Sequence, residues 1–304
     1  MRTALIVPTL NAGAGFAAWL AAYAAQRRPA ERCLVIDSSS DDDTAAQARA
    51  AGLEVLVIPR AEFNHGGTRQ RAVAWLADAE IVAFATQDAL FADDLALDRL
   101  FRAFEKPTVG AAYGRQLPHV CARPIGAHAR LYNYPPQAAV RTLEDRARLG
   151  LKTVFISNSF AAYRRDALVS VGGFPTNTIM NEDTFVAARL LLAGWQVAYC
   201  AEAQVHHSHD YGVAEEFRRY FDIGVFHARE AWLRESFGVA ESEGGRYVRS
   251  ELHYLAREAP WLIPSAVVRN AAKWAGYRLG CAESRLPLRL KRRLSMHRRY
   301  WNAP

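Results

Sequence analysis

Short apolar runs alternate with longer Ala-rich or amphipathic segments along the first third of the chain. The apolar runs predict strands buried on both faces, and they occupy residues 4–7, 33–36, 55–58 and 81–85. The segments between them predict helices at residues 16–25, 44–51 and 68–77. Strands of this kind separated by helices indicate a mostly parallel sheet flanked by helices, which is an α/β fold. Ligands of such sheets bind beyond the carboxyl ends of the strands.

The second half of the chain has a less regular pattern. It predicts one or two strands within residues 152–163, a helix at 182–193, short strands at 196–200 and 204–207, and nearly continuous helix from 213 onward. We therefore expect a catalytic body over residues 1–210 and a helical C-terminal extension over residues 211–304.

The composition is that of a folded protein. Hydrophobic residues make up 51% of the chain and charged residues 23%, which excludes a disordered chain. No run reaches the roughly 18 uncharged apolar residues that a membrane span needs. The four cysteines lie far apart without a CxxC pair, so we expect free thiols in a reducing compartment. The first residues lead into a strand without a signal-peptide pattern, and we expect a cytoplasmic protein.

The net charge of +7 is concentrated at the C-terminal end. Seven basic residues lie between Arg285 and Arg299, no acidic residue follows Glu283, and the rest of the chain is balanced. A nucleic-acid-binding protein more often spreads its charge over the folded body, so we expect no nucleic-acid partner. A local cationic tail instead fits an anionic membrane surface.

Apolar residues in this tail recur at a helical spacing, at Leu286, Leu290, Leu294 and Trp301. Because most basic residues lie off this stripe, the tail is typical of an interfacial helix that holds a protein peripherally at a membrane. The alternative is that the stripe packs on the body and leaves its charges in solvent.

Polar residues follow the first, second and fourth predicted strands, where a ligand of a parallel sheet would lie. Neither GxGxxG nor GxxxxGK[ST] is present, which argues against a Rossmann dehydrogenase or a P-loop enzyme. A cation would then have to neutralise bound phosphates. Asp37 could accept the imino proton of a pyrimidine base, whereas Ser40 or Asp41 could simply cap the next helix.

Three further clusters carry candidate chemistry. Gly66 and Gly67 allow a close backbone approach and Arg69 could face a phosphate, although Thr68 could also be a helix N-cap.

Alternation along the last predicted strand places His207 and His209 on one face, where a distant Asp could complete a metal or diphosphate site. Glu182 and Asp183 open a predicted helix, either as partners of its dipole or as a base for an acceptor hydroxyl.

Taken in order, five motifs make the chain resemble family-2 glycosyltransferases with the GT-A fold. They occupy residues 8–11, 37–44, 86–88, 172–174 and 181–183, and the resemblance covers roughly residues 1–210. The finer sequence is similar to that of bacterial rhamnosyltransferases that use dTDP-L-rhamnose, at residues 63–69, 86–89, 155–159 and 205–211.

The resemblance implies an inverting, metal-dependent transfer of L-rhamnose from dTDP-L-rhamnose to a saccharide in bacterial surface polysaccharide synthesis. The nucleotide sugar would lie on a half at about 1–115 and the acceptor on a half at about 116–210. Acceptors of this kind are usually lipid-linked, which implies a peripheral location at the inner face of the cytoplasmic membrane.

The resemblance also assigns roles to individual residues. Asp88 matches the second Asp of the family's DxD motif and would bind Mg²⁺ or Mn²⁺, with His207 as a further ligand and His209 as the runner-up. Asp183 matches the general base, and Glu182 would assist in acceptor binding. Thr9 and Asp37 would hold the pyrimidine base of the donor nucleotide. The whole donor site would consist of Thr9, Asn11, Asp37, Ser39, Gly67, Arg69, Gln87 and Asp88.

One position departs from the family pattern, because Thr86 stands where the first Asp of DxD would be. That Asp commonly contacts ribose hydroxyls, and a thymidine nucleotide lacks the 2′-hydroxyl, so the departure fits a dTDP donor. It is also compatible with weaker metal binding. The alternatives are a transferase for a UDP-sugar such as galactose or galactofuranose, and a non-catalytic carbohydrate-binding scaffold protein.

Overall fold

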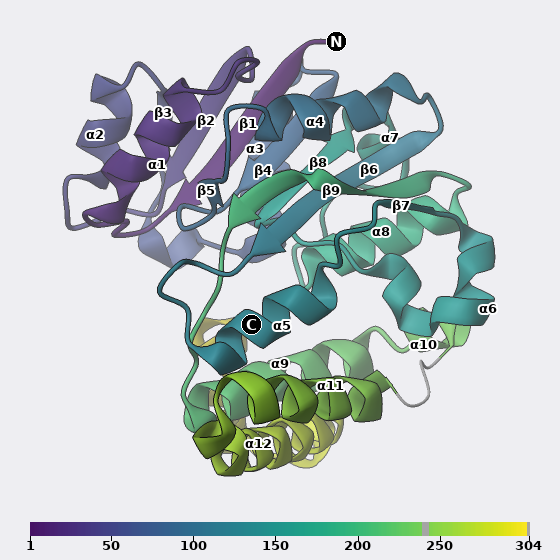
Figure 1. The fold of residues 1–304 in the computed structure, drawn as a ribbon. Coiled ribbons are helices and arrows are strands. Elements are labelled where there is room, and N and C mark those ends of the chain that lie inside the picture. Colours follow the sequence, from purple (N-terminus) through teal and green to yellow (C-terminus); the bar gives the residue numbers. More distant parts are fainter. Residues whose placement is uncertain (239–242, 303–304) are drawn as a thin grey trace.

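The computed structural model describes residues 1–238 and 243–302, and its strands form one mixed sheet (Figure 1). Their order in the sheet is β3-β2-β1-β4-β8-β6-β9-β5, and β7 pairs with β9. The strands are β1 (Thr3–Thr9), β2 (Arg32–Asp37), β3 (Glu54–Val57), β4 (Ile81–Ala85), β5 (Leu90–Phe91), β6 (Val109–Leu117), β7 (Ala139–Arg141), β8 (Phe160–Arg164) and β9 (Gln196–His206).

Strands β1 to β4 are parallel to one another, as their apolar runs predict. Thr9 at the end of β1 lies opposite Asp37 at the end of β2. β8 runs antiparallel between β4 and β6, and β6 pairs with β9 in parallel. The carboxyl ends of β1, β2, β4 and β9 therefore lie along one edge, which confirms that the predicted polar clusters meet there.

Alternating side chains of the central strands face two different cores. Leu5 and Val7 belong to one core, which is covered by α1 (Gly15–Ala24), α2 (Thr44–Ala50) and α4 (Ala96–Arg102). Ala4 and Ile6 belong to the other, which is covered by α3 (His65–Trp75), α7 (Arg165–Ser170) and α8 (Glu182–Leu192). Both faces are thus buried, which is why these strands read as continuous apolar runs.

Three local predictions were wrong. The two short strands predicted at 196–200 and 204–207 are the single strand β9, whose pairing with β6 slips in register between Gly114 and Arg115. Within residues 152–163 only the end belongs to β8, because residues 150–154 form a 3₁₀ turn. Helix α3 begins at His65, since the side chain of Asn64 accepts a hydrogen bond from the Gly67 amide and caps the helix.

Helices follow β9 to the end of the described chain, as the sequence pattern predicts. They are α9 (Val213–Arg229), α10 (Trp232–Phe237), α11 (Glu243–Glu258), α12 (Ile263–Cys281) and α13 (Leu288–Leu294). Figure 1 shows α9, α11 and α12 as a layer beneath α5 (Pro124–Asn133), with the short helix α6 (Arg146–Leu149) to one side. Among the described residues, no helix combines the length and apolar character needed to cross a bilayer.

Glycines set the spacing of α9 and α12. A Cβ on Gly280 would lie 2.0 Å from the Phe221 carbonyl oxygen, and one on Gly276 would lie 2.3 Å from that of Phe217. Gly224 of α9 makes the reciprocal contact, 2.3 Å from the Tyr277 carbonyl oxygen. The two backbones therefore touch directly, and a Cβ at any of these glycines would push the two helices apart.

The C-terminal tail packs on the catalytic body. Trp301 is 7% exposed and belongs to the main core, while Leu286 and Leu294 pack against that core. The carboxylate of Asp222 in α9 accepts hydrogen bonds from the amides of Met296 and His297 at 2.9 and 3.0 Å. Three of the four stripe residues therefore pack on protein and Leu290 stays exposed, so the alternative, a stripe that packs on the body, describes most of this tail.

Candidate active site

The loops after β1 and β2 are fastened to each other by polar side chains. The Thr9 hydroxyl donates to Asp37 Oδ1 at 3.0 Å, and the Ser40 amide donates to Asp37 Oδ2 at 2.9 Å. Ser40 Oγ in turn accepts from the Asn11 amide at 2.8 Å. Asp37 is only 1% exposed, so its carboxylate fixes the shape of the two loops. Leu10 and Asn11, which follow β1, are exposed beside this network.

Gln87 joins these loops to the end of β4. Its amide oxygen accepts from the Leu10 amide at 2.8 Å, and its amide nitrogen donates to the Leu10 carbonyl at 3.1 Å. Asn11 and Ser39 have φ angles of 47° and 56°, in the left-handed region that is costly for residues other than glycine. Strained backbone held by a dense hydrogen-bond network is typical of a preformed ligand site.

Asp88, His207 and His209 form a cluster at the same edge of the sheet. Asp88 Oδ2 lies 3.4 Å from His207 Nε2 and 3.9 Å from His209 Nε2. One ligand atom from each residue lies within 4.8 Å of the other two. The three residues predicted as metal ligands, including the runner-up His209, are thus brought together from the segments that follow β4 and β9.

Gln116 on β6 orients His207. His207 Nδ1 lies 2.8 Å from Gln116 Oε1, which also accepts from Arg130 Nη1 at 3.0 Å. The Gln116 amide nitrogen donates to Ser157 Oγ at 3.0 Å. Gln116 Oε1 can only accept a hydrogen bond, so we assign the imidazole proton of His207 to Nδ1. The lone pair of His207 Nε2 then faces Asp88.

The protonation states suit metal binding. Burial lowers the pKa of His207, and it lowers the pKa of His209 to about 4, with the neighbouring His207 adding to the effect. Burial opposes ionisation of Asp88, but its interactions with His207, and then with Thr86, outweigh that effect, and the pKa of Asp88 lies well below its usual range. Two neutral imidazoles and one carboxylate are therefore present at neutral pH, and such a ligand set could hold a divalent metal ion.

Asp183 and Glu182 are neighbours with different environments. Both Asp183 oxygens accept backbone N–H groups, from Asn158 at 3.0 Å and from Thr184 at 2.7 Å. Burial, followed by the charge of Glu182, raises the pKa of Asp183 to about 6. Its side chain is partly exposed, whereas Glu182 is 5% exposed. A partly exposed carboxylate with a pKa near neutrality is suited to act as a general base.

Residues 4–172 match the family described as Glycosyl transferase family 2. The chain belongs to this family, and it is a glycosyltransferase. It is 47% identical to the O-antigen chain rhamnosyltransferase WbaN of Salmonella anatum, over 98% of this chain and 95% of that protein. It is 46% identical to the O-antigen chain rhamnosyltransferase RfbN of Salmonella typhimurium, over 99% of this chain and 96% of that protein.

The fold is also shared with solved glycosyltransferases. The mannosyltransferase PcManGT from Pyrobaculum calidifontis, whose structure is a complex with GDP-Man and Mn²⁺, superposes with a TM-score of 0.57. That comparison covers 99% of this chain and 85% of PcManGT at 22% identity, so it establishes the GT-A fold alone.

The structure places three of the predicted site residues away from the expected contacts in this glycosyltransferase. Arg69 is 5% exposed, and its Nη1 lies 3.1 Å from Glu182 Oε1, so the guanidinium is enclosed rather than open to a phosphate. The Gly67 amide is used by the Asn64 cap. Glu182 also accepts from Asn158 Nδ2 at 3.0 Å, and this buried pairing holds the start of α8 rather than an acceptor.

Sequence reasoning missed residues that support the site from a distance. Gln116 and Arg130 orient the histidine cluster, and Asn158 contacts both acids of α8. No signal in the sequence marked Gln116, because the pattern did not predict a strand there and the neighbouring Arg115 is polar as well. Asn181, at φ 59°, is the third residue other than glycine with a positive φ in the described chain.

Proposed function

We propose that this glycosyltransferase transfers L-rhamnose from dTDP-L-rhamnose, with inversion, to a lipid-linked saccharide in O-antigen synthesis. The observation that carries the proposal is that a partly exposed base and the Asp88, His207 and His209 cluster lie at one sheet edge. The base, Asp183, accepts from the Asn158 amide just before β8, and β8 begins opposite the end of β4. The names of the Salmonella relatives support the sugar and the polysaccharide, because those proteins align over nearly their whole length.

The reaction is a single displacement. An acceptor hydroxyl gives its proton to Asp183 as its oxygen attacks the anomeric carbon, and the bond from that carbon to the diphosphate oxygen breaks on the opposite face. The nucleoside diphosphate leaves with the electron pair. Inversion follows because attack and departure occur on opposite faces of one carbon.

The ligand set fits a resident divalent cation. One carboxylate and two neutral imidazoles suit Mn²⁺ better than Mg²⁺, which prefers oxygen ligands. A cation held by Asp88, His207 and His209 would supply positive charge against the departing diphosphate. Gln116 keeps His207 in the tautomer that ligation requires, and burial keeps both imidazoles neutral.

The donor nucleotide lies, in this proposal, across the loops after β1 and β2. Thr9 and Asp37 hold the loops in shape from below, while Asn11, Ser39 and Gln87 border the surface that receives the base. Thr86 in place of a carboxylate supports a deoxyribose nucleotide, which has no 2′-hydroxyl to bind. The competing donor is a UDP-sugar.

A donor panel tests the proposal. We expect transfer and slow donor hydrolysis with dTDP-L-rhamnose, and at least tenfold lower rates with UDP-galactose and GDP-mannose. Removal of divalent metal with EDTA should abolish both reactions, and Mn²⁺ should restore them. Preference for UDP-galactose would overturn the dTDP assignment, and unchanged rates in EDTA would overturn the metal assignment.

We also propose that the enzyme works peripherally at the inner face of the cytoplasmic membrane. Exposed arginines of the tail, namely Arg289, Arg292, Arg293, Arg298 and Arg299, support attraction to anionic lipids. Each such residue contributes about 1 kcal/mol at most near the surface. Sedimentation with anionic vesicles at low salt and release at high salt is the expected result; equal sedimentation with neutral vesicles would contradict it.

A further inference from the structure

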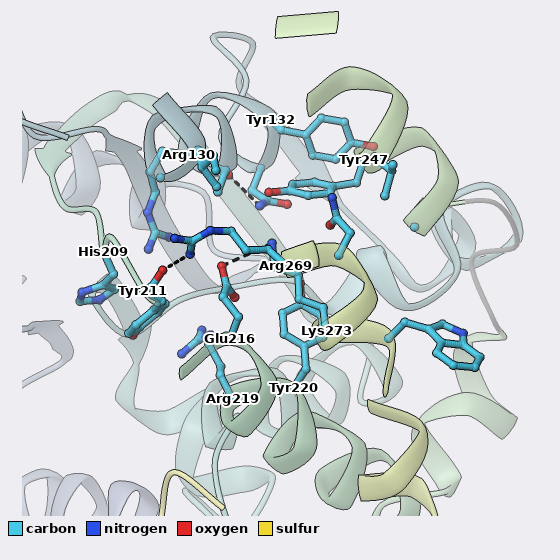
Figure 2. Close-up of a pocket in the computed structure, with 18 of the residues that line it drawn as sticks. Arg130, Tyr132, His209, Tyr211, Glu216, Arg219, Tyr220, Tyr247, Arg269 and Lys273 are labelled. Carbon is cyan, nitrogen blue, oxygen red and sulfur yellow. Dashed lines mark hydrogen bonds and ion pairs between the residues drawn. The ribbon is translucent and has the colours of Figure 1, made fainter. Parts of the chain in front are cut away.

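A cavity of about 680 Å³ lies among α5, α9, α11 and α12, beneath the carboxyl edge of the sheet (Figure 2). His209 belongs to the cluster with Asp88 and also lines this cavity. Figure 2 shows Arg219 and Tyr220 rising from α9 on one side, and Tyr132 and Tyr247 on the other. The cavity therefore borders the reaction centre without being part of the nucleotide loops.

The cavity has an excess of positive charge. Its lining contains six basic and three acidic side chains. Each acid is already engaged: Glu216 lies 3.4 Å from Lys273, Glu243 pairs with Lys152, and Asp210 accepts from the amide of Arg123. The remaining basic side chains must therefore be compensated by solvent or by a ligand.

Three arginines carry this excess. Arg130 donates to Gln116 Oε1, Arg269 donates to the Tyr211 carbonyl, and Arg219 lies over the Tyr211 ring at 5.7 Å. These partners are all neutral, and within residues 1–238 and 243–302 no carboxylate lies within ion-pair distance of the three guanidiniums. Guanidinium groups held in this way are suited to bind phosphate oxygens.

Aromatic side chains supply the rest of the wall. Tyr132, Tyr220 and Tyr247 line the cavity, and their rings offer apolar faces with a polar tip. A sugar ring has the complementary character, with an apolar C–H face and a rim of hydroxyls. The lining thus fits a saccharide that carries a negative charge.

The cavity continues into an exposed apolar face of α12. Trp274 lines the cavity and is still 68% exposed. Val267 and Val268, about two turns earlier on the same helix, are each 54% exposed, and Trp261 before the helix is 74% exposed. Large apolar side chains gathered on one solvent-facing helix usually mark a contact with lipid or with another apolar partner.

We propose that this cavity and the exposed face of α12 bind the two parts of an amphiphilic acceptor. A phosphate or diphosphate between the saccharide and an apolar chain lies against Arg219 and Arg269, and the chain leaves over Trp274 along α12. The inference rests on the proposed function, because it names the acceptor of that transfer. It also places the lipid contact on α12, whereas most of the tail's apolar stripe is buried.

Farnesyl diphosphate, inorganic diphosphate and farnesol serve as probes for the full-length protein, by calorimetry with dTDP and Mn²⁺ in excess. We expect farnesyl diphosphate to bind at least roughly tenfold more tightly than either fragment, because it joins the charged and apolar contacts. Arg269→Gln and Arg219→Gln should each weaken both diphosphates by roughly tenfold. Trp274→Ser should weaken farnesyl diphosphate and farnesol but leave inorganic diphosphate unchanged.

Trp75→Ser is the matched control, since Trp75 is 54% exposed on α3, outside the cavity lining, and should change no affinity. Equal binding of farnesyl diphosphate and inorganic diphosphate would overturn the proposal. So would a loss of dTDP affinity in the arginine variants as large as the loss of farnesyl diphosphate, because the arginines would then serve the donor. Failure of the wild-type protein to bind dTDP would instead overturn the proposed function. The affinities of farnesyl diphosphate, inorganic diphosphate and farnesol would still test the cavity.

Discussion

The polar loops at the sheet edge and the helical layer beneath them are held by different physical means. The loops depend on hydrogen bonds between short polar side chains, such as Thr9 to Asp37, and on strained backbone at Asn11. The helical layer depends on direct backbone contact at glycines, such as Gly280 against Phe221. Loss of one polar group should therefore impair chemistry in the loops, whereas loss of one close contact should impair stability in the layer.

The largest expected effect is on catalysis at the sheet edge. Asp183→Asn preserves the size of the side chain and removes its ability to take a proton, so we expect transfer to fall by roughly 10²-fold or more. Binding of dTDP should change little. Initial rates and calorimetry on the same preparation measure the two effects. A variant with near-normal turnover would remove Asp183 from the mechanism.

The next effect is on stability in the helical layer. Gly280→Ala places a methyl group 2.0 Å from the Phe221 carbonyl oxygen, so α9 and α12 must separate. We expect a loss of about 1–3 kcal/mol in the free energy of unfolding, measured in urea. Gly245→Ala is the control, because a Cβ there meets nothing within 4 Å. Equal stabilities of the two variants would show that α9 and α12 accept the methyl group without a measurable cost.

The hydrogen bonds between Asp222 of α9 and the C-terminal tail offer a test of the same helical layer at a polar contact. Asp222→Ala removes the acceptor of two backbone N–H groups, and we expect about 2 kcal/mol of destabilisation. Asp222→Asn keeps one acceptor oxygen and avoids burying a charge, so its unfolding free energy should lie closer to that of the wild type. An alanine variant as stable as the wild type would indicate that these two hydrogen bonds contribute nothing to the free energy of unfolding.

A smaller effect is expected behind the metal cluster. Gln116→Leu removes the acceptor that fixes the His207 tautomer, and Mn²⁺ should bind roughly tenfold more weakly. Titration of activity with Mn²⁺ measures this shift, and the rate at saturating Mn²⁺ should be nearly restored. A lower plateau with unchanged Mn²⁺ affinity would point to a structural role for Gln116 instead.

The smallest effect is a pH dependence. Because burial raises the pKa of Asp183 to about 6, the carboxylate is ionised above that pH and protonated below it. The value of kcat/KM for the acceptor should therefore be about half its plateau at pH 6 and about a tenth of it at pH 5. A profile that stays flat down to pH 5 would argue against this base.

The N-terminal half of the fold could be predicted because its signals are local. Apolar runs such as 81–85 fill buried strands, and a parallel arrangement forces the residues after each strand to one edge. The same rule placed Asp88 and His207 together, although they are far apart in the chain. The boundaries of β9 and α3 were less predictable, because a register slip and an Asn cap each moved them by a few residues.

The sequence by itself determined the family, the four parallel strands β1 to β4 and the residue types at the sheet edge. Tertiary structure decided which partner each side chain took: Arg69 binds Glu182 rather than being open to a phosphate, and Gln116 orients His207. It also decided that Trp301 packs on protein. The physical reason is that burial of apolar area is non-directional, so a stripe of leucines and tryptophan predicts a buried face without naming what covers it. Charged groups likewise pair with whichever partner the fold brings within reach.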